Sequence, residues 1–326
     1  MKPSSLWCLA LVTPVAVGAC GSDDDGGGEV SGDHYRYVVS TLSTMATNKL
    51  DIDGNGRTEN KLGELLQGLS TFPIQATIDE TLARGSVLLL ADVQTTSFSG
   101  ASAAGFSVYL GDSATTMPAP CTDNTMLATC GQHLKGTGTF TVAATSPRDA
   151  QLTGPFAGGT LKAGPGKLSL QLALSGTPVT VGLIGAQVQI GDVSADGINR
   201  GIFGGGVTQA ELDSVVLPAV VAQIKSVVDR DCGPESERTL RASDNTCGRT
   251  PVGGSFTPCM DTGATVLAPS SGFDTAPAPR DCKVSLAELK AHPLLGQALT
   301  PDVMVNGQAA VSAVLGFTAK KATFTP

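Results

Sequence analysis

The sequence predicts an α+β fold, in which an antiparallel β-sheet body carries an N-terminal helix–loop–helix, a few packed helices and disulfide-stapled loops. Three observations predict it. Apolar residues recur at helical spacing near the start, apolar and polar residues alternate through the middle, and capped helical stretches return later. A doubly wound parallel sheet is disfavoured, because strands and helices do not alternate strictly along the chain.

Three helices are predicted between residues 35 and 85, from apolar residues spaced three or four apart. The apolar positions of the first helix, over 35–50, are Tyr35, Val38, Val39, Leu42 and Met45. Those of the second are Leu62, Leu65, Leu66 and Leu69. Those of the third, which follows Pro73 and stops at Gly85, are Ile74, Ile78 and Leu82.

Alternating residues predict antiparallel strands through the middle of the chain. The run 87–90 is apolar throughout, as in a strand buried on both faces. The alternating apolar positions are Phe140, Val142 and Ala144, then Leu168, Leu170, Leu172 and Leu174, then Val179, Val181 and Leu183, then Val188 and Ile190. A final hairpin is expected at Asn306-Gly307, with 311–317 as its return strand.

The best-marked helix follows a glycine-rich stretch, Gly201 to Gly206, which we interpret as a backbone bend. Thr208 and Glu211 fit a capping box, and apolar residues from 212 to 227 form one face of the helix. Pro218 lies inside this helix and should kink it. A second capping box, at 285–288, opens a short helix that ends before residue 301.

The N-terminus reads as a secretory signal, with Lys2 followed by an apolar stretch too short to span a bilayer. Val17-Gly18-Ala19-Cys20 resembles the lipobox of bacterial lipoproteins, which implies cleavage before Cys20 and a lipid on its thiol. We therefore expect a signal peptide over 1–19, a lipid anchor and flexible tether over 20–33, and a single domain over 34–326. By resemblance to enteric sorting rules, Gly21 rather than Asp after the cysteine favours the outer membrane, so the expected location is the cell envelope, at the outer membrane of a Gram-negative bacterium.

Composition excludes one class of partner. The formal net charge is −8, and the 21 Lys and Arg residues are scattered along the sequence. Because nucleic-acid binding needs clustered positive charge, we expect no nucleic-acid partner. The membrane, reached through the lipid on Cys20, is the expected partner.

Cysteine usage indicates an oxidising compartment. Cys8 leaves with the signal peptide and Cys20 carries lipid, so six cysteines remain for disulfides. Fifteen pairings are possible, and the simplest is sequential: Cys121–Cys130, Cys232–Cys247 and Cys259–Cys282. The last four lie in a Gly-, Pro-, Ser- and Thr-rich excursion over 229–283. Zinc is disfavoured, because no CxxC occurs and no histidine stands at ligand spacing from the cysteines.

Residues 51–59 carry the strongest chemical signal. Asp51, Asp53 and Asn55 occupy positions 1, 3 and 5 of an EF-hand-type loop, Gly56 occupies position 6, and Glu59 position 9. Calcium prefers six to eight oxygen ligands, so alternate side chains must point inward while the glycine permits the turn. We therefore predict a structural Ca²⁺ ion held by these residues, together with the backbone carbonyl of Arg57.

One position departs from the calcium-loop pattern. Position 12, where a bidentate Glu is usual, is Leu62, so Glu59, Glu64 or water would have to substitute. The weakened shell predicts an affinity on the order of 10⁻⁴ to 10⁻³ M. The alternative is an Asp-, Asn- and Gly-rich turn without an ion.

The segment DIDGNGRTENKLG also resembles one that recurs in a group of uncharacterised bacterial lipoproteins, in which a calcium-loop-like DxDGDGxxDNxLG motif follows the anchor. Asn55 and Glu59 replace two of the motif's Asp residues, while Asn60, Leu62 and Gly63 match. The glycine-rich stretch before the capped helix and the segment 315–319 fit the same group. The resemblance implies no known activity.

No catalytic constellation is visible, since GxSxG is missing and no histidine lies beside an activating motif. We therefore expect a non-enzymatic envelope protein with a structural or ligand-presenting role, with an apolar ligand or another envelope protein as its partner. In one alternative, the alternating segments over 168–190 curl around an apolar ligand such as a lipid. In another, a hydrolase, His133 or His292 would lie beside a serine and a carboxylate.

Overall fold

The computed structural model describes residues 29–68, 74–121, 130–148, 150–173, 178–269, 272–274 and 280–326. The expected signal peptide (1–19), Cys20 and most of the expected tether lie outside these residues.

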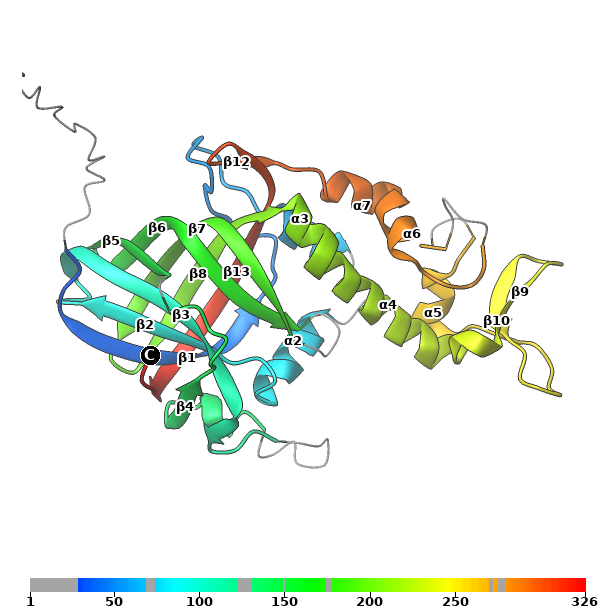
Figure 1. The fold of residues 1–326 in the computed structure, drawn as a ribbon, viewed down its shortest axis with the longest axis horizontal. Coiled ribbons are helices and arrows are strands. Elements are labelled where there is room, and N and C mark those ends of the chain that lie inside the picture. The colour runs from blue at the N-terminus through cyan, green and yellow to red at the C-terminus, as the bar shows by residue number, and fades with distance from the viewer. Residues whose placement is uncertain are drawn as a thin grey trace, which may run out of the picture.

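Eight antiparallel strands form a closed, barrel-like sheet (Figure 1). Around the ring they are β1 (Asp33–Ser43), β2 (Leu89–Thr95), β3 (Gly100–Met117), β5 (Gln151–Ala157), β6 (Thr160–Ala173), β7 (Pro178–Ser194), β8 (Gly197–Thr208) and β13 (Gln308–Thr323). The ring closes because β13 pairs with β1 and β3 pairs with β5. The predicted antiparallel body is confirmed, but the described chain is mostly β and not a clear α+β fold.

The main hydrophobic core lies inside the closed sheet, because all eight strands contribute side chains to it. Its centre contains Phe106, Phe203 and Phe317, and the Phe317 ring centroid lies 6.2 Å from that of Phe106 and 5.0 Å from that of Phe203. Aromatic rings at these separations pack in favourable tilted arrangements. Side chains therefore fill the middle of the barrel.

The predicted first helix, over 35–50, is wrong, because residues 33–43 form strand β1. Tyr37 and Val39 belong to the main core, whereas Val38 is buried in a second cluster with Leu88 and Leu90 on the other face of the sheet. A strand buried on both faces lacks polar alternation, so its apolar residues also fit helical spacing. The expected helix–loop–helix is thus a strand–loop–helix.

The glycine-rich stretch 201–206 is not a bend but the middle of β8. A Cβ on Gly201 would lie 2.4 Å from the ring of Phe317 on the neighbouring strand. One on Gly204 would lie 2.5 Å from the carbonyl oxygen of Ala313. These glycines occur because a side chain would collide with β13, which packs closely against β8.

Two short strands extend the sheet. β4 (Gly138–Val142) pairs with β3 and with the end of β13, and β12 (Val303–Val305) pairs with the start of β13. The predicted final hairpin is confirmed, and Asn306 and Gly307 have φ values of 49° and 76° at its turn. Such left-handed conformations are typical of Asn-Gly in two-residue hairpins. A short 3₁₀ turn, η2 (Gln132–Leu134), precedes β4.

Helices gather at one end of the closed sheet (Figure 1). They are α1 (Lys61–Gly68), α2 (Ile74–Ala83), the continuous run α3 (Gln209–Glu211), η3 (Leu212–Val216) and α4 (Leu217–Cys232), and the pair α6 (Leu286–Ala291) and α7 (Pro293–Ala298). The predicted helices at 62–68, 74–82 and 208–227 are confirmed in type, while Leu69 lies outside the described residues. The single short helix predicted from 285 is two helices, α6 and α7, because the residue before Pro293, His292, is extended. None of the helices within the described residues is both long and apolar enough to cross a membrane.

The two predicted capping boxes differ in detail. The box at Ser285 and Glu288 is complete. At the start of α3, Thr208 Oγ1 accepts from the Glu211 N–H, but the Glu211 carboxylate accepts instead from the backbone N–H of Gly182 in β7. The helix has a π-helical stretch, η3, which ends two residues before Pro218. Regular α-helical bonding is interrupted in this region, and Pro218 itself cannot donate a backbone hydrogen bond.

The Cys-rich excursion contains a 3₁₀ turn, η4 (Glu235–Glu237), a small sheet of β9 (Arg238–Arg241), β10 (Thr246–Arg249) and β11 (Thr257–Pro258), and helix α5 (Asp261–Val266). Cys121–Cys130 is the one sequential disulfide that the structure contains. The predicted pairs Cys232–Cys247 and Cys259–Cys282 are wrong, because the bonds are Cys232–Cys259 and Cys247–Cys282. The reason is tertiary: α4 ends at Cys232 and packs against α5, which begins just after Cys259.

Candidate functional site

The predicted calcium loop connects the end of β1 to α1. Its ends are held together by an antiparallel bridge, in which Leu50 N–H donates to the Glu59 carbonyl at 3.3 Å and Glu59 N–H donates to the Leu50 carbonyl at 2.9 Å. Gly54 and Gly56 have φ values of 75° and 83°, a region that glycine enters without steric cost. The chain between them therefore folds back sharply, as a calcium loop requires.

Three of the five predicted ligands come together. One oxygen each of Asp51, Asp53 and Glu59 lie within 4.8 Å of one another. Asp51 Oδ2 accepts from the Gly56 N–H at 2.9 Å, while Asp51 Oδ1 and Glu59 Oε2 are buried and have no hydrogen-bond partner among the described residues. Buried oxygens without donors are rare in folded proteins, so a cation or a water molecule would be favourable at this position.

The other two predicted ligands are placed differently. Asn55 Oδ1 accepts from the Arg57 N–H at 2.8 Å, so it closes the turn. Arg57 is exposed, and its expected contribution was only its backbone carbonyl. Neither Leu62 nor Glu64 completes the shell, because Leu62 is buried in the apolar core and Glu64 is exposed and pairs with Lys49 at 3.0 Å.

Electrostatics at the loop favour a cation. Burial raises the pKa of Glu59, and the neighbouring carboxylates of Asp53, Asp51 and Asp302 raise it further. Sequence reasoning missed Asp302, which lies more than 240 residues away and belongs to no motif. Its carboxylate accepts from the N–H and the O–H of Ser312, at 2.7 and 2.6 Å. A bound cation would offset this concentration of negative charge.

The loop is attached to strands of the closed sheet and its rim. Gln187 of β7 donates to the carbonyls of Asp51 and Ile52, at 2.7 and 3.2 Å, and the Met304 N–H of β12 lies 3.4 Å from Asp53 Oδ2. Leu50 and Ile52 pack in a small apolar cluster whose other members are Val303, Val305, Ala310 and Val314. Movement of the loop would therefore disturb β7, β12 and β13 together.

An apolar cavity of about 40 Å³ lies where the helices meet the closed sheet. Its walls come from β6, β7, β8 and β13 and from α1, α2, η3, α4, α6 and α7. A cleft of about 470 Å³ adjoins it, and Leu65 and Leu295 line both spaces. The cleft also contains Lys61 and His292.

The three histidines lie in different environments. His133 is fully buried, and its Nε2 lies 3.2 Å from the Leu82 carbonyl oxygen. His292 packs against Phe273 in the cleft wall, with ring centroids 4.5 Å apart. His34 is half-exposed on the outer face of β1 and pairs with Asp92 at 3.0 Å. The hydrolase alternative needed His133 or His292 beside a serine and a carboxylate, whereas these two rings contact a backbone carbonyl and an aromatic ring.

Comparison with known protein families, with curated proteins and with solved structures finds no match to this chain.

Proposed function

We propose that this chain is a lipid-anchored protein of the cell envelope whose 51–59 loop binds a structural Ca²⁺ ion, and whose role is structural or ligand-presenting. The observation that carries the proposal is the group of Asp51, Asp53 and Glu59, with two buried oxygens that lack donors within the described residues. Carboxylate oxygens in an irregular arrangement suit calcium better than magnesium, which demands near-ideal octahedral geometry.

The ion would stabilise the connection between β1 and α1. It would replace mutual repulsion among carboxylates by attraction to one cation, and it would hold the loop against β7 and β12. With an affinity of about 10⁻⁴ to 10⁻³ M, calcium at ~1 mM would stabilise the fold by about 0.4–1.4 kcal/mol.

Thermal unfolding with and without calcium tests the proposal. We expect Ca²⁺ at ~1 mM to raise the Tm by about 1–5 °C, and chelation to reverse the rise. Asp51→Asn and Glu59→Gln should abolish the shift. Asp33→Asn, an exposed carboxylate at the start of β1, is the matched control and should leave it unchanged. A wild-type Tm that ignores calcium, or a shift that survives in both loop variants, would refute calcium binding here.

Lipid attachment is tested separately, by growing cells with an alkyne-labelled fatty acid. We expect label on the chain, loss of label in Cys20→Ser and retention of label in Cys8→Ser. Recovery of unlabelled wild-type protein would remove the anchor from the proposal.

A second candidate function, binding of an apolar ligand, is favoured by the cavity and cleft that share Leu65 and Leu295. An amphiphile would place its apolar part in the cavity and its polar end in the cleft, near Lys61 and His292. Because the cavity is small, α1 and α7 would have to separate to admit the ligand. Apolar walls with few polar groups are typical of small-molecule sites.

Native mass spectrometry of the purified chain tests this candidate. We expect co-purifying lipid, and its loss in Ala313→Phe, which fills the cavity wall. Ala309→Phe, at an exposed position of the same strand, is the control. A wild-type chain without bound lipid that also fails to bind added phenylnaphthylamine, a fluorescent apolar probe, would eliminate the candidate.

A further inference from the structure

The cleft beside the apolar cavity carries an unequal set of charges. Its polar lining residues are Lys61, Glu64, His292 and Gln297, and the other lining residues are apolar or glycine. Among the described residues that line it, Lys61 is the one lysine or arginine and Glu64 is the one carboxylate. The partners of these two side chains determine which charge a ligand would meet there.

Lys61, the first residue of α1, keeps an unbalanced positive charge. Its Nζ donates to the carbonyl oxygen of Thr300 at 2.6 Å, and it forms no ion pair within the part of the chain that the structure describes. An ammonium group has three donors, so two remain for a ligand. A hydrogen bond from an ammonium group to a carboxylate is stronger than one between neutral groups. A ligand carboxylate is therefore the acceptor that Lys61 favours.

Glu64 does not cancel the charge of Lys61. Its carboxylate is exposed and lies 3.0 Å from the Nζ of Lys49. Counted with that partner, Glu64 is neutral. The carboxylates of the 51–59 loop do not line the cleft. The cleft is therefore left with the single positive charge of Lys61.

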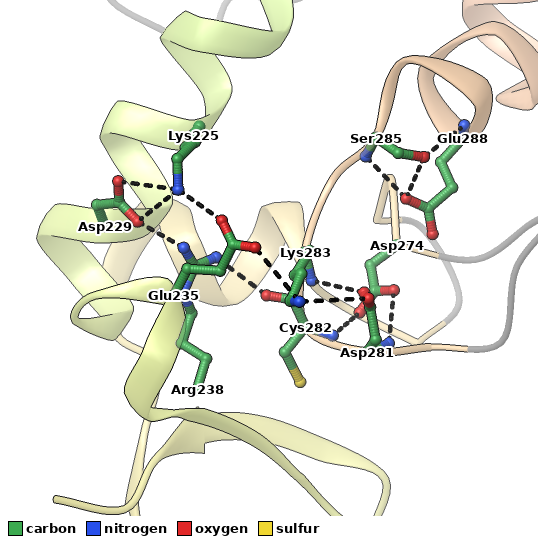
Figure 2. Close-up of polar contacts among 10 residues, drawn as sticks. All are labelled: Lys225, Asp229, Glu235, Arg238, Asp274, Asp281, Cys282, Lys283, Ser285 and Glu288. Atoms are coloured by element: carbon green, nitrogen blue, oxygen red, sulfur yellow. Dashed lines mark hydrogen bonds and ion pairs between the residues drawn. The ribbon is translucent and has the colours of Figure 1, made fainter.

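The cleft wall formed by Phe273 and His292 is held in place by polar contacts that Figure 2 shows in part. Asp274, next to Phe273 in the chain, is fully buried and accepts from the N–H groups of residues 281 and 282, at 3.2 and 2.8 Å. The Glu288 side chain completes the capping box of α6, and its carbonyl oxygen accepts from the His292 N–H at 3.0 Å. A wall that is already formed lowers the ordering cost of binding.

We propose that the cleft selects a single-chain amphiphile with a carboxylate head, such as a fatty acid, and that Lys61 Nζ binds the carboxylate. This inference rests on the apolar-ligand candidate above, because it names the ligand class for the same site. Leu65 and Leu295, which line both spaces, would contact the chain next to its head, and the apolar cavity would accept part of the tail.

Two other head groups compete with the carboxylate. A phosphate monoester carries about −1.5 to −2 charges near neutral pH, so one lysine would leave part of that charge unbalanced beside Glu64. A carboxylate carries a single charge, which Lys61 alone neutralises. An ammonium head would be repelled by Lys61. The charge balance of the cleft therefore favours the carboxylate.

Displacement of phenylnaphthylamine at neutral pH tests the inference with four amphiphiles of equal chain length: dodecanoate, dodecanol, dodecylamine and dodecyl phosphate. We expect dodecanoate to compete at about fivefold lower concentration than dodecanol, because a partly exposed ion pair adds up to about that factor. Dodecylamine should compete more weakly than dodecanol.

Variants of Lys61 test the assignment of the carboxylate. Lys61→Met should remove the preference for dodecanoate over dodecanol, whereas Lys61→Arg, which keeps the charge, should retain it. Lys61→Glu should reverse the order, so that dodecylamine competes best. Lys135→Gln is the control, because Lys135 is exposed and lines neither the cavity nor the cleft, and it should keep the wild-type order.

The outcomes separate this inference from the function on which it rests. It is overturned if dodecanoate and dodecanol compete equally well with the wild type, if dodecyl phosphate competes better than dodecanoate, or if Lys61→Met keeps the preference for the acid. In each of these cases apolar-ligand binding itself still stands. If neither phenylnaphthylamine nor any of the four amphiphiles binds, the apolar-ligand function fails and this inference fails with it.

Discussion

Asn60 and Val314 form a reciprocal pair of hydrogen bonds, in which Asn60 Nδ2 donates to the Val314 carbonyl and the Val314 N–H donates to Asn60 Oδ1, both at 2.9 Å. Asn60 is 1% exposed, and its amide also donates to the Asn48 carbonyl at 2.8 Å and accepts from the Gly63 N–H at 3.0 Å. One side chain thus joins the end of the 51–59 loop and the start of α1 to strand β13.

Replacing Asn60 should destabilise the fold strongly. Asn60→Ala leaves several buried backbone groups without partners, and we expect a loss of about 2–4 kcal/mol in the free energy of unfolding. Urea denaturation in calcium-free buffer measures it. Gln308→Ala, at an exposed position of β13, should change stability by less than about 0.5 kcal/mol. Equal effects of the two substitutions would contradict the role given to Asn60.

Calcium affinity should fall as the pH is lowered. The ion requires ionised Glu59, whose pKa is raised by burial and by the nearby carboxylates. Protonation therefore begins at a higher pH than for an ordinary glutamate and competes with the metal. Calcium titrations by calorimetry from neutral pH downward check this, and Glu59→Gln should remove that part of the pH dependence. Affinity that stays constant down to the usual glutamate range would contradict the prediction.

For the stability of the metal-free fold, the same pKa shift predicts the opposite pH dependence. Because the folded-state pKa of Glu59 is above its unfolded value, its contribution to stability is present below the unfolded pKa and is lost as the pH rises through the folded one. In chelator, Glu59→Gln should therefore stabilise the chain at neutral pH and have less effect in acid. Urea denaturation at the two pH values measures the difference, and a uniform effect at both would argue against it.

His133 should make the fold sensitive to acid. Burial lowers its pKa, so the stability that it contributes is present above the unfolded pKa of about 6.5 and is lost as the pH falls toward the folded value. His133→Gln should flatten the fall in the free energy of unfolding below that pH. An unchanged pH slope in this variant would show that other groups cause the acid sensitivity.

Gly201→Ala tests the packing of β8 against β13. The new Cβ would lie 2.4 Å from the Phe317 ring, so we expect a loss of about 1–3 kcal/mol. Phe317→Leu in the same chain should recover part of it, as a double-mutant cycle would show. Gly100→Ala is the control, because its nearest atom would be 4.0 Å away. A loss in the control equal to that of Gly201→Ala would indicate a general glycine effect.

The disulfide pairing predicts different thiol contents for two double variants. Cys232→Ser with Cys259→Ser removes one bond and leaves Cys247–Cys282 intact, so neither Cys247 nor Cys282 should be a free thiol. Cys232→Ser with Cys247→Ser breaks two bonds and leaves Cys259 and Cys282 without their partners. Alkylation and peptide mapping distinguish the two, and a free thiol at Cys247 or Cys282 in the first variant would contradict the pairing.

Local patterns predicted much of the architecture. Period-two runs located β6 and β7, helical spacing located α1 and α2, and Asn306-Gly307 located the last hairpin, because each signal depends on neighbours in the sequence. The acidic spacing at 51–59 likewise identified three side chains that come together. Strand β1 was predicted as a helix because burial on both faces removes the alternation that marks a strand.

What the sequence determined by itself was local: turn residues, caps, helix faces, and the spacing of Asp51, Asp53 and Glu59. The tertiary structure decided which distant segments meet. It closed the sheet through β13 and β1, brought Asp302 to the 51–59 loop and exchanged two disulfide partners. The physical reason is that long-range contacts depend on the packing of whole faces, which no short window of sequence specifies.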